Sequence, residues 1–219
     1  LPKLATLVLD HCGLAESDLP TIVQHAPQLT TLNISNSGIT SVAALASLTK
    51  LERLMISNTG VTTLTPLANL TIRQLMTENT AIVSINELRG TRLVKCIRQW
   101  NCPIVTDGYD VLGEMPQLEE VNIAGDESTK ELVLDLSPLA NAQNLVWLDV
   151  GYVGVQDINF VSSLPNLQYL LIATSNLTSM MIGDATLPES LVYLDFGGNC
   201  ITSLEELHLE RLQKLEYIS

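Results

Sequence analysis

The residue types that most often perform chemistry are few in this chain of 219 residues, and they are widely spaced. None of the three histidines lies at a spacing that suggests a nucleophile–histidine–acid set; they are His11, His25 and His208. No cysteine–histidine pair has the spacing of a zinc site. The segment DGYD (107–110) has two carboxylates but lacks the remaining ligands of an EF-hand calcium loop. The sequence therefore predicts no enzyme, no metal and no cofactor.

The cysteines are not expected to form disulfides. Cys12, Cys96, Cys102 and Cys200 show no paired spacing, and a chain of this length needs no disulfide to fold. We therefore expect four free thiols.

The composition describes the core that must position any functional residue. Leucine fills 39 of the 219 positions, and 46% of the residues are hydrophobic, whereas only 4% are aromatic. Such a chain buries enough aliphatic surface to exclude disorder, and no uncharged apolar run approaches the ~18 residues of a membrane span. A net charge of −13 argues against nucleic acid or an anionic membrane as a partner.

A repeated segment runs through the whole sequence. LTTLNISNSGITSVAALASLTK begins at Leu29, and LERLMISNTGVTTLTPLANL begins 22 residues later at Leu51. Both fit the pattern L-x-x-L-x-L-x-x-(N/C/T/S)-x-L. The same frame starts at Leu4, Leu29, Leu51, Ile72, Val94, Leu118, Leu145, Leu167, Leu191 and Leu215. We expect one domain over residues 1–219, with nine repeats and a partial tenth, cut from a longer chain because neither end carries a cap.

Two of these starts are less regular than the others. A start at Leu93 would also fit the pattern, but it would bury Arg98. The repeat from Leu118 has about five extra residues in GDESTKE, which we expect to form a loop where the strand ends.

The pattern indicates an α/β fold, namely a right-handed, curved leucine-rich-repeat solenoid. Positions 4 and 6 of each repeat alternate with polar neighbours, so each repeat should form one short strand with those two side chains inward. Later apolar residues return the chain along the convex side in short helical, 3₁₀ or irregular segments. Stacked repeats then make a concave parallel sheet of about ten strands over a shared core.

The short repeats resemble those of bacterial internalins, and the segments that carry the resemblance are VTTLTPLANL (61–70), LDLSPLANAQNL (134–145) and LPNLQYLLIATSNLTSM (164–180). Their period is equally similar to that of the leucine-rich regulatory subunit of type-one protein phosphatase. The resemblance implies a solenoid that grips another protein on its concave sheet. The chain departs from the usual pattern at position 9, where asparagine occurs only at Asn199. Cys12 and Cys102 occupy this inward position.

Positions 3, 5 and 7 should face away from the core on the concave side. Position 3 places Trp147, Tyr169, Tyr193 and Tyr217 in one row across the last four strands, because equivalent residues of neighbouring parallel strands lie about 4.8 Å apart. Position 5 adds Asp149, Leu171 and Asp195, and position 7 adds Gly151, Ala173 and Gly197. Aromatic rows also stabilise sheets, but the scarcity of aromatic residues elsewhere favours a binding surface. Cys96 should lie on the same face, where it would be open to reaction.

Charge suggests which protein would bind. Between Glu131 and Glu210 the chain has ten acids and no Lys or Arg. This favours a protein ligand with a basic surface, although solubility of the convex side explains the charge equally well. The basic cluster RGTRLVKCIR (89–98) has too few aromatics among its charges for a nucleic-acid site.

Two functions remain. The first is a non-catalytic protein-binding module, either an adhesin-like surface receptor or an intracellular scaffold. The second is the recognition arm of a larger enzyme whose catalytic domain lies outside these residues. A bacterial surface or secreted location is favoured over the cytoplasm, and the oligomeric state is open.

Overall fold

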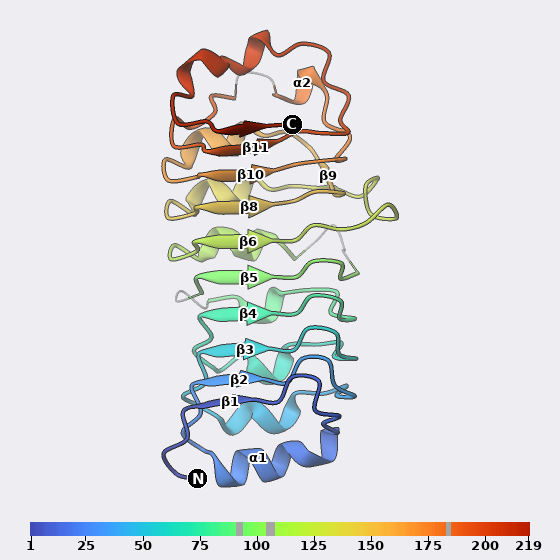
Figure 1. Cartoon of the computed structure of the whole chain (residues 1–219), viewed down its shortest axis with the longest axis vertical. Helices are drawn as coiled ribbons and strands as arrows, with labels where there is room; N and C mark the ends of the chain where they lie inside the picture. Colours follow the sequence, from blue (N-terminus) through green and yellow to red (C-terminus); the bar gives the residue numbers. More distant parts are fainter. Residues whose placement is uncertain (91–93, 104–107, 183–184) are drawn as a thin grey trace.

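Among the residues that the structure describes, ten short strands form one parallel sheet in which neighbours follow chain order (Figure 1). The computed structural model describes residues 1–90, 94–103, 108–182 and 185–219. The strands are β1 (Thr6–Val8), β2 (Thr31–Asn33), β3 (Arg53–Met55), β4 (Gln74–Met76), β5 (Cys96–Arg98), β6 (Glu120–Asn122), β8 (Trp147–Asp149), β10 (Tyr169–Leu171), β11 (Tyr193–Asp195) and β12 (Tyr217–Ile218). The predicted parallel solenoid sheet is confirmed.

Alternation of side chains explains why each strand forms where it does. Every strand of the sheet begins two residues after an expected repeat start, at position 3. In β3, Leu54 points inward and is fully buried, whereas Arg53 on one side of it is exposed. In β5, Ile97 is buried and Arg98 is exposed, which is the orientation that a repeat starting at Val94 requires. Leu93, the alternative start, lies outside the described residues.

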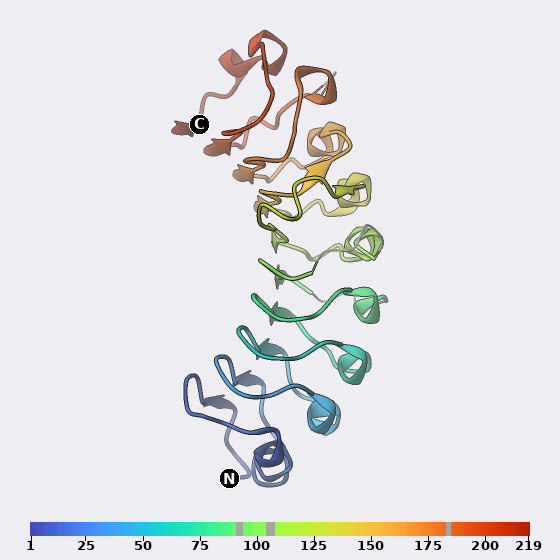
Figure 2. The same ribbon diagram turned by 90° about the vertical axis from the view of Figure 1, so that its right-hand side faces the viewer.

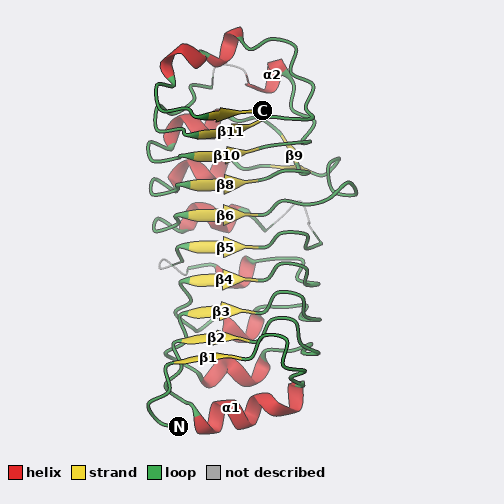
Figure 3. Ribbon diagram, viewed as in Figure 1, coloured by secondary structure: helices red, strands yellow, loops and turns green. Residues whose placement is uncertain are grey.

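The convex side is built from short helices, most of them 3₁₀ helices (Figure 3). The α-helices are α1 (Leu19–His25) and α2 (Ser179–Ile182), and the 3₁₀ helices are Glu16–Asp18, Ala43–Ser47, Thr65–Leu67, Asn86–Leu88, Asp110–Glu114, Ser137–Asn141, Asn159–Ser163, Glu205–Leu207 and Leu209–Arg211. Many of these helices begin at a hydrogen bond in which a side-chain oxygen accepts the backbone N–H two residues later. The hydroxyl of Ser41, for example, accepts the N–H of Ala43, and the carboxylate of Asp135 accepts that of Ser137. Ser, Thr and Asp bond backbone two residues ahead in this way and so start a turn.

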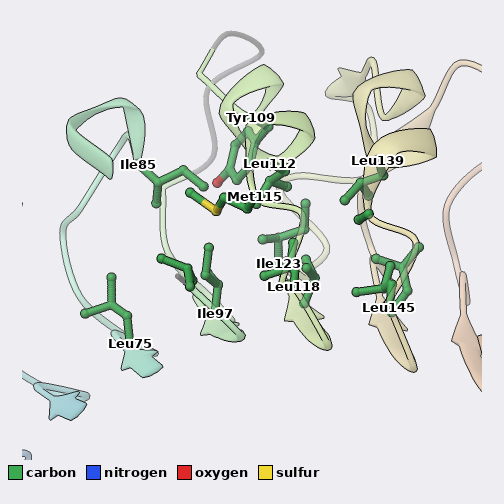
Figure 4. Packing of buried hydrophobic residues seen from close by; sticks show 14 of the residues in the cluster. Leu75, Ile85, Ile97, Tyr109, Leu112, Met115, Leu118, Ile123, Leu139 and Leu145 are labelled. Atoms are coloured by element: carbon green, nitrogen blue, oxygen red, sulfur yellow. The ribbon is translucent and has the colours of Figure 1, made fainter. Parts of the chain in front are cut away.

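The core lies between the sheet and these helices, and the stack bends so that the sheet lines its concave side (Figure 2). Inward residues of successive strands, such as Leu75 and Ile97, meet convex-side residues such as Ile85 and Leu112 (Figure 4). All four are 0–1% exposed. One repeat cannot bury its apolar residues alone, so the core exists only because the repeats stack.

The chain turns away from the sheet at position 8, where the backbone adopts the left-handed conformation. Asn36, Asn58, Asn79 and Asn101 hold this position in successive repeats, with φ between 53° and 56°. Asparagine tolerates positive φ better than most residues, which explains its use here. Farther along the chain the same conformation falls on Tyr152 and Thr174.

Position 9 carries a ladder of small polar side chains in place of the asparagine ladder. The hydroxyl of Thr59 donates to the carbonyl of Ile56 at 2.6 Å, and that of Ser175 donates to Val150 of the preceding repeat. The Cys102 thiol donates to the carbonyl of Thr77 and is buried, as expected. Cys12 is exposed, so its expected burial is wrong, and no repeat within residues 1–219 packs over it.

The expected loop in GDESTKE forms at the end of β6 and projects beyond the sheet (Figure 1). It returns through β7 (Val133–Leu134), which pairs in parallel with β9 (Gly154–Val155). The hydroxyl of Thr129 ties the loop to the next repeat by donating to the carbonyl of Tyr152 at 2.7 Å. The sequence analysis did not predict this second, two-stranded sheet.

Candidate protein-binding surface

Four aromatic residues form one row on the concave face, which we call the aromatic column. Strand register pairs Trp147 with Tyr169, Tyr169 with Tyr193, and Tyr193 with Tyr217. Successive ring centroids are 4.7, 6.3 and 4.3 Å apart, and the interplanar angles are 25°, 30° and 10°. The inward neighbours Leu148, Leu170 and Leu194 are all 0% exposed, so the rings stand on the side opposite the core.

Stacking determines which parts of the rings a ligand could touch. Stacked rings turn their faces toward one another, so the column presents ring edges and hydroxyl groups to the concave space. Ring edges carry the positive part of the aromatic quadrupole. Burial among its neighbours raises the pKa of Tyr193, and a hydrogen bond with Tyr217 adds to this effect. The column is thus an uncharged surface suited to apolar groups and hydrogen-bonding partners.

The predicted acidic lane beside the column is partly occupied by contacts within the chain. One oxygen of Asp149 accepts the N–H of Gly151 at 3.1 Å, and the other accepts the side-chain amide of Asn122 at 3.1 Å. One oxygen of Asp195 accepts the N–H of Gly197 at 2.9 Å. Both aspartates therefore stabilise the end of their own strand. Burial raises the pKa of Asp149, with the nearby charge of Asp195 a smaller cause in the same direction.

A lane of small residues lies beyond the aspartates. Gly151, Ala173 and Gly197 occupy position 7 of successive repeats, and their small size leaves the concave face open there. A Cβ atom added at Gly197 would lie 3.1 Å from a carboxylate oxygen of Asp195, so a larger residue would disturb that aspartate. The column, Leu171 and this lane together form a broad, shallow surface across β8, β10, β11 and β12.

A second exposed aromatic residue of the concave face was missed by the sequence analysis. Trp100 is 45% exposed and follows β5 at position 7. The signal was available, because the repeat frame from Val94 places Trp100 on the outward side. It was overlooked because no other aromatic residue lies in its row.

The basic cluster at residues 89–98 is largely neutralised within the chain, as far as the structure describes it. Arg89 pairs with Asp110 and Glu114, Lys95 with Glu119, and Arg98 with Glu120. Arg92 lies outside the described residues. Paired guanidinium and ammonium groups are poorly placed to neutralise phosphates.

The expectation that Cys96 is open to reaction is wrong. Its side chain is 5% exposed although it points to the concave side, because it is short and lies beside the ion pair of Arg98 and Glu120. Burial raises the pKa of the Cys96 thiol to about 12, and Glu120 contributes to this rise. The reactive thiolate is therefore scarce at neutral pH. All four cysteines are free.

Among the residues that the structure describes, no group of three or more His, Cys, Asp and Glu side chains is arranged to hold a metal ion. Asp107, the first carboxylate of DGYD, lies outside them. The helices of that part of the chain include none with the length and hydropathy needed to cross a membrane.

Comparisons with known proteins agree with the fold. A family model described as leucine-rich repeats in two copies matches residues 27–69. No curated protein sequence matches the chain. The internalin InlF of Listeria monocytogenes is 24% identical with a TM-score of 0.69, and the alignment covers 94% of this chain and 64% of InlF. The internalin InlC2 of the same organism is 21% identical with a TM-score of 0.68, over 98% of this chain and 80% of InlC2.

Plant receptors have the same fold. The Arabidopsis receptor kinase HAESA, solved in complex with a peptide hormone and a co-receptor, is 17% identical with a TM-score of 0.67. The alignment covers 92% of this chain and 35% of HAESA, so this chain spans less than two thirds of both InlF and HAESA. Ten sequential parallel strands, the repeat pattern and these likenesses lead to one conclusion. The chain has a leucine-rich-repeat fold, and its solenoid is similar to those of the internalins.

Proposed function

We propose that the chain is a non-catalytic module that binds a partner protein or peptide on its concave face, at a cell surface or in secreted form. The observation that carries the proposal is the aromatic column. Four large side chains stand in register on the open side of the sheet, in a chain with only 4% aromatic residues. Tryptophan and tyrosine dominate the energy of protein interfaces.

The surroundings of the column support the same function. Leu171 and the small-residue lane beside it leave room for a partner's side chains. Asp195 has a carboxylate oxygen with no hydrogen-bond partner among the described residues, which suits a basic group at the edge of the contact. Asp149 is less suited, because both of its oxygens accept hydrogen bonds within the chain. HAESA, solved with a peptide hormone, shows that this fold is compatible with peptide recognition.

A random peptide library displayed on phage tests the proposal without a known partner. Peptides are selected on the wild-type chain and then measured against Trp147→Ala and Tyr169→Ala. We expect each variant to weaken binding by about 2 kcal/mol, or roughly 30-fold, because hot-spot aromatics contribute on that scale.

The matched control is Tyr152→Ala, which removes an exposed tyrosine outside the column. This control should bind the selected peptides as the wild type does. Selected peptides that bind all variants equally well would contradict the proposal.

A further inference from the structure

A second hollow of the concave face lies in the N-terminal half, away from the aromatic column. Its lining includes Asp10, Met55, Met76, Glu78 and Trp100, and we call it the N-terminal groove. The methionines are at position 5 of β3 and β4, whereas the other three residues are at position 7 of their repeats. The groove therefore runs along the stack, across the ends of the strands.

Backbone bonds hold the position-7 residues in register beyond the strands. The N–H of Asn58 donates to the carbonyl of Glu78, and the N–H of Asn79 donates to that of Trp100. With about 4.8 Å between strands, the groove spans roughly 19 Å from Asp10 to Trp100. Asp10 and Glu78 are three strands apart, which corresponds to about 14 Å.

The two ends of this span are acidic, and each acid keeps one oxygen free of hydrogen bonds among the described residues. Asn36 donates to one oxygen of Asp10 at 2.8 Å, and His11 contacts the same oxygen at 3.0 Å. The hydroxyl of Ser57 donates to one oxygen of Glu78. Arg98 lies at the end of β5, the strand next to β4. Its guanidinium is paired with Glu120 and does not form an ion pair with Glu78.

The part of the groove between the acids combines polar and apolar side chains, because Ser35 and Ser57 line it together with Met55 and Met76. Both methionines are only partly exposed, and Trp100 closes the far end with 45% of its surface open. Methionine fits varied apolar partners because its side chain is flexible and polarizable. The groove can therefore contact apolar as well as basic groups of a partner.

We propose that the N-terminal groove binds an extended peptide segment that carries basic residues at positions i and i+4 and an apolar residue at i+2. An extended chain advances about 3.3–3.4 Å per residue, so residues i and i+4 are roughly 13.5 Å apart and match the spacing of Asp10 and Glu78. Residues i, i+2 and i+4 share one face of the segment. That face would place the apolar side chain beside Met55. It would place the basic side chain of residue i+4 at Glu78, one strand away from Trp100.

The test uses Trp100 as the reporter. The chain has two tryptophans, so the Trp147→Phe variant leaves Trp100 as its single tryptophan. The probe is acetyl-Gly-Lys-Ser-Leu-Ser-Lys-Gly-amide, with lysines at i and i+4. Saturable change in Trp100 fluorescence is expected with this peptide. A peptide with its lysines at i and i+2 should bind at least about threefold more weakly, and a peptide with glutamates in place of lysines should not bind.

Variants of the chain locate the contact. Asp10→Asn and Glu78→Gln should each weaken the probe about threefold to fivefold, as expected for an exposed ion pair. Glu131→Gln is the matched control, because it removes one charge in the loop after β6 and should leave binding unchanged. Circular dichroism of each variant verifies that it is folded.

Tyr169→Ala should also leave the binding of the probe unchanged, because Tyr169 does not line the groove. A negative result for the groove is therefore distinguishable from a negative result for the aromatic column. Equal binding of the i+2 and i+4 peptides, or no change in Trp100 fluorescence at millimolar probe, would overturn the proposal. Sedimentation equilibrium tests whether the groove instead binds a second copy of the chain. A dimer that Trp100→Ala abolishes would assign the groove to a second copy of the chain and overturn the peptide interpretation.

Discussion

The two halves of the concave face share one backbone frame but differ in where their large side chains lie. In the C-terminal half, position 3 carries the aromatic column, and positions 5 and 7 carry small or acidic residues apart from Leu171. In the N-terminal half, position 3 carries polar residues such as Thr31 and Arg53, and the exposed apolar groups move to positions 5 and 7, at Met55, Met76 and Trp100. The inward leucines set the frame, and the outward positions vary independently of it.

The core beneath both surfaces should respond in the same way to truncation. Leu170→Ala removes a fully buried side chain on the inward side of β10, next to Tyr169 of the column, and Leu54→Ala does so beneath β3. Each should lower the free energy of unfolding by about 2–5 kcal/mol, since both leave a cavity. Urea unfolding measures the loss. A loss below 1 kcal/mol for one of them would show that its half is loosely packed.

Position 3 should distinguish the two halves. Tyr193→Ala removes contacts with two neighbouring rings, so we expect it to destabilise the chain by about 1–3 kcal/mol. Arg53→Ala, at the same position in the other half, should change stability by no more than about 0.5 kcal/mol, because Arg53 is an exposed surface residue. Thermal unfolding of both variants gives the comparison. Equal effects would mean that ring stacking adds nothing to the fold.

Position 8 offers a reciprocal pair of substitutions. Thr174 has a φ of 54°, which is unfavourable for a β-branched residue, whereas Asn58 has a φ of 56° and a suitable side chain. Thr174→Asn should stabilise the chain by about 1 kcal/mol, and Asn58→Thr should destabilise it by about as much. Both changes are measured by denaturant unfolding. A destabilising Thr174→Asn would show that the threonine side chain compensates for its backbone strain.

Position 5 adds a smaller effect that depends on pH. Because the pKa of folded Asp149 is raised above the ordinary value of 3.8, the folded state binds the proton more tightly, and stability falls as pH rises through this window. Asp149→Asn removes the charge and still accepts the N–H of Gly151, as Asn122 does for Ala124.

The variant also loses the hydrogen bond from Asn122, because its second side-chain atom is an amide nitrogen, and this loss does not depend on pH. The stability of the variant relative to the wild type should therefore rise from pH 3 to pH 7. Urea unfolding at pH 3 and pH 7 measures the difference in stability. In the other half of the chain the equivalent residue is Asn33, which does not titrate and so needs no such test. A difference that is equal at both pH values would contradict burial as the cause.

The outward and inward sides of each strand were predictable because alternation has a period of two and the leucines recur at fixed positions. This explains why the sequence alone places Trp147, Tyr169, Tyr193 and Tyr217 in one row. Hydrogen bonds between side chain and backbone were not predictable from spacing. Asp149 was expected to face a partner, but its oxygens are engaged by Asn122 and Gly151.

The repeat pattern also does not predict how far neighbouring side chains cover a given residue. Cys96 has the outward orientation that the frame predicts, yet its neighbours cover it because its side chain is short. Cys12 has the position of a buried residue, but no repeat within residues 1–219 covers it. The pairing of β7 with β9 depends on an inserted loop, whose path a repeat pattern does not specify.

The polar ladder at position 9 has a consequence for how the chain would come apart under tension. Ser37 and Thr59 bond carbonyls of their own repeats, so they do not link one repeat to another. Ser175 and Asn199 also donate hydrogen bonds to carbonyls of the preceding repeat, at Val150 and Ile172, and thereby link neighbouring repeats. Pulling on the two ends should therefore peel repeats singly from the N-terminal end, whereas the C-terminal repeats should yield together and at higher force.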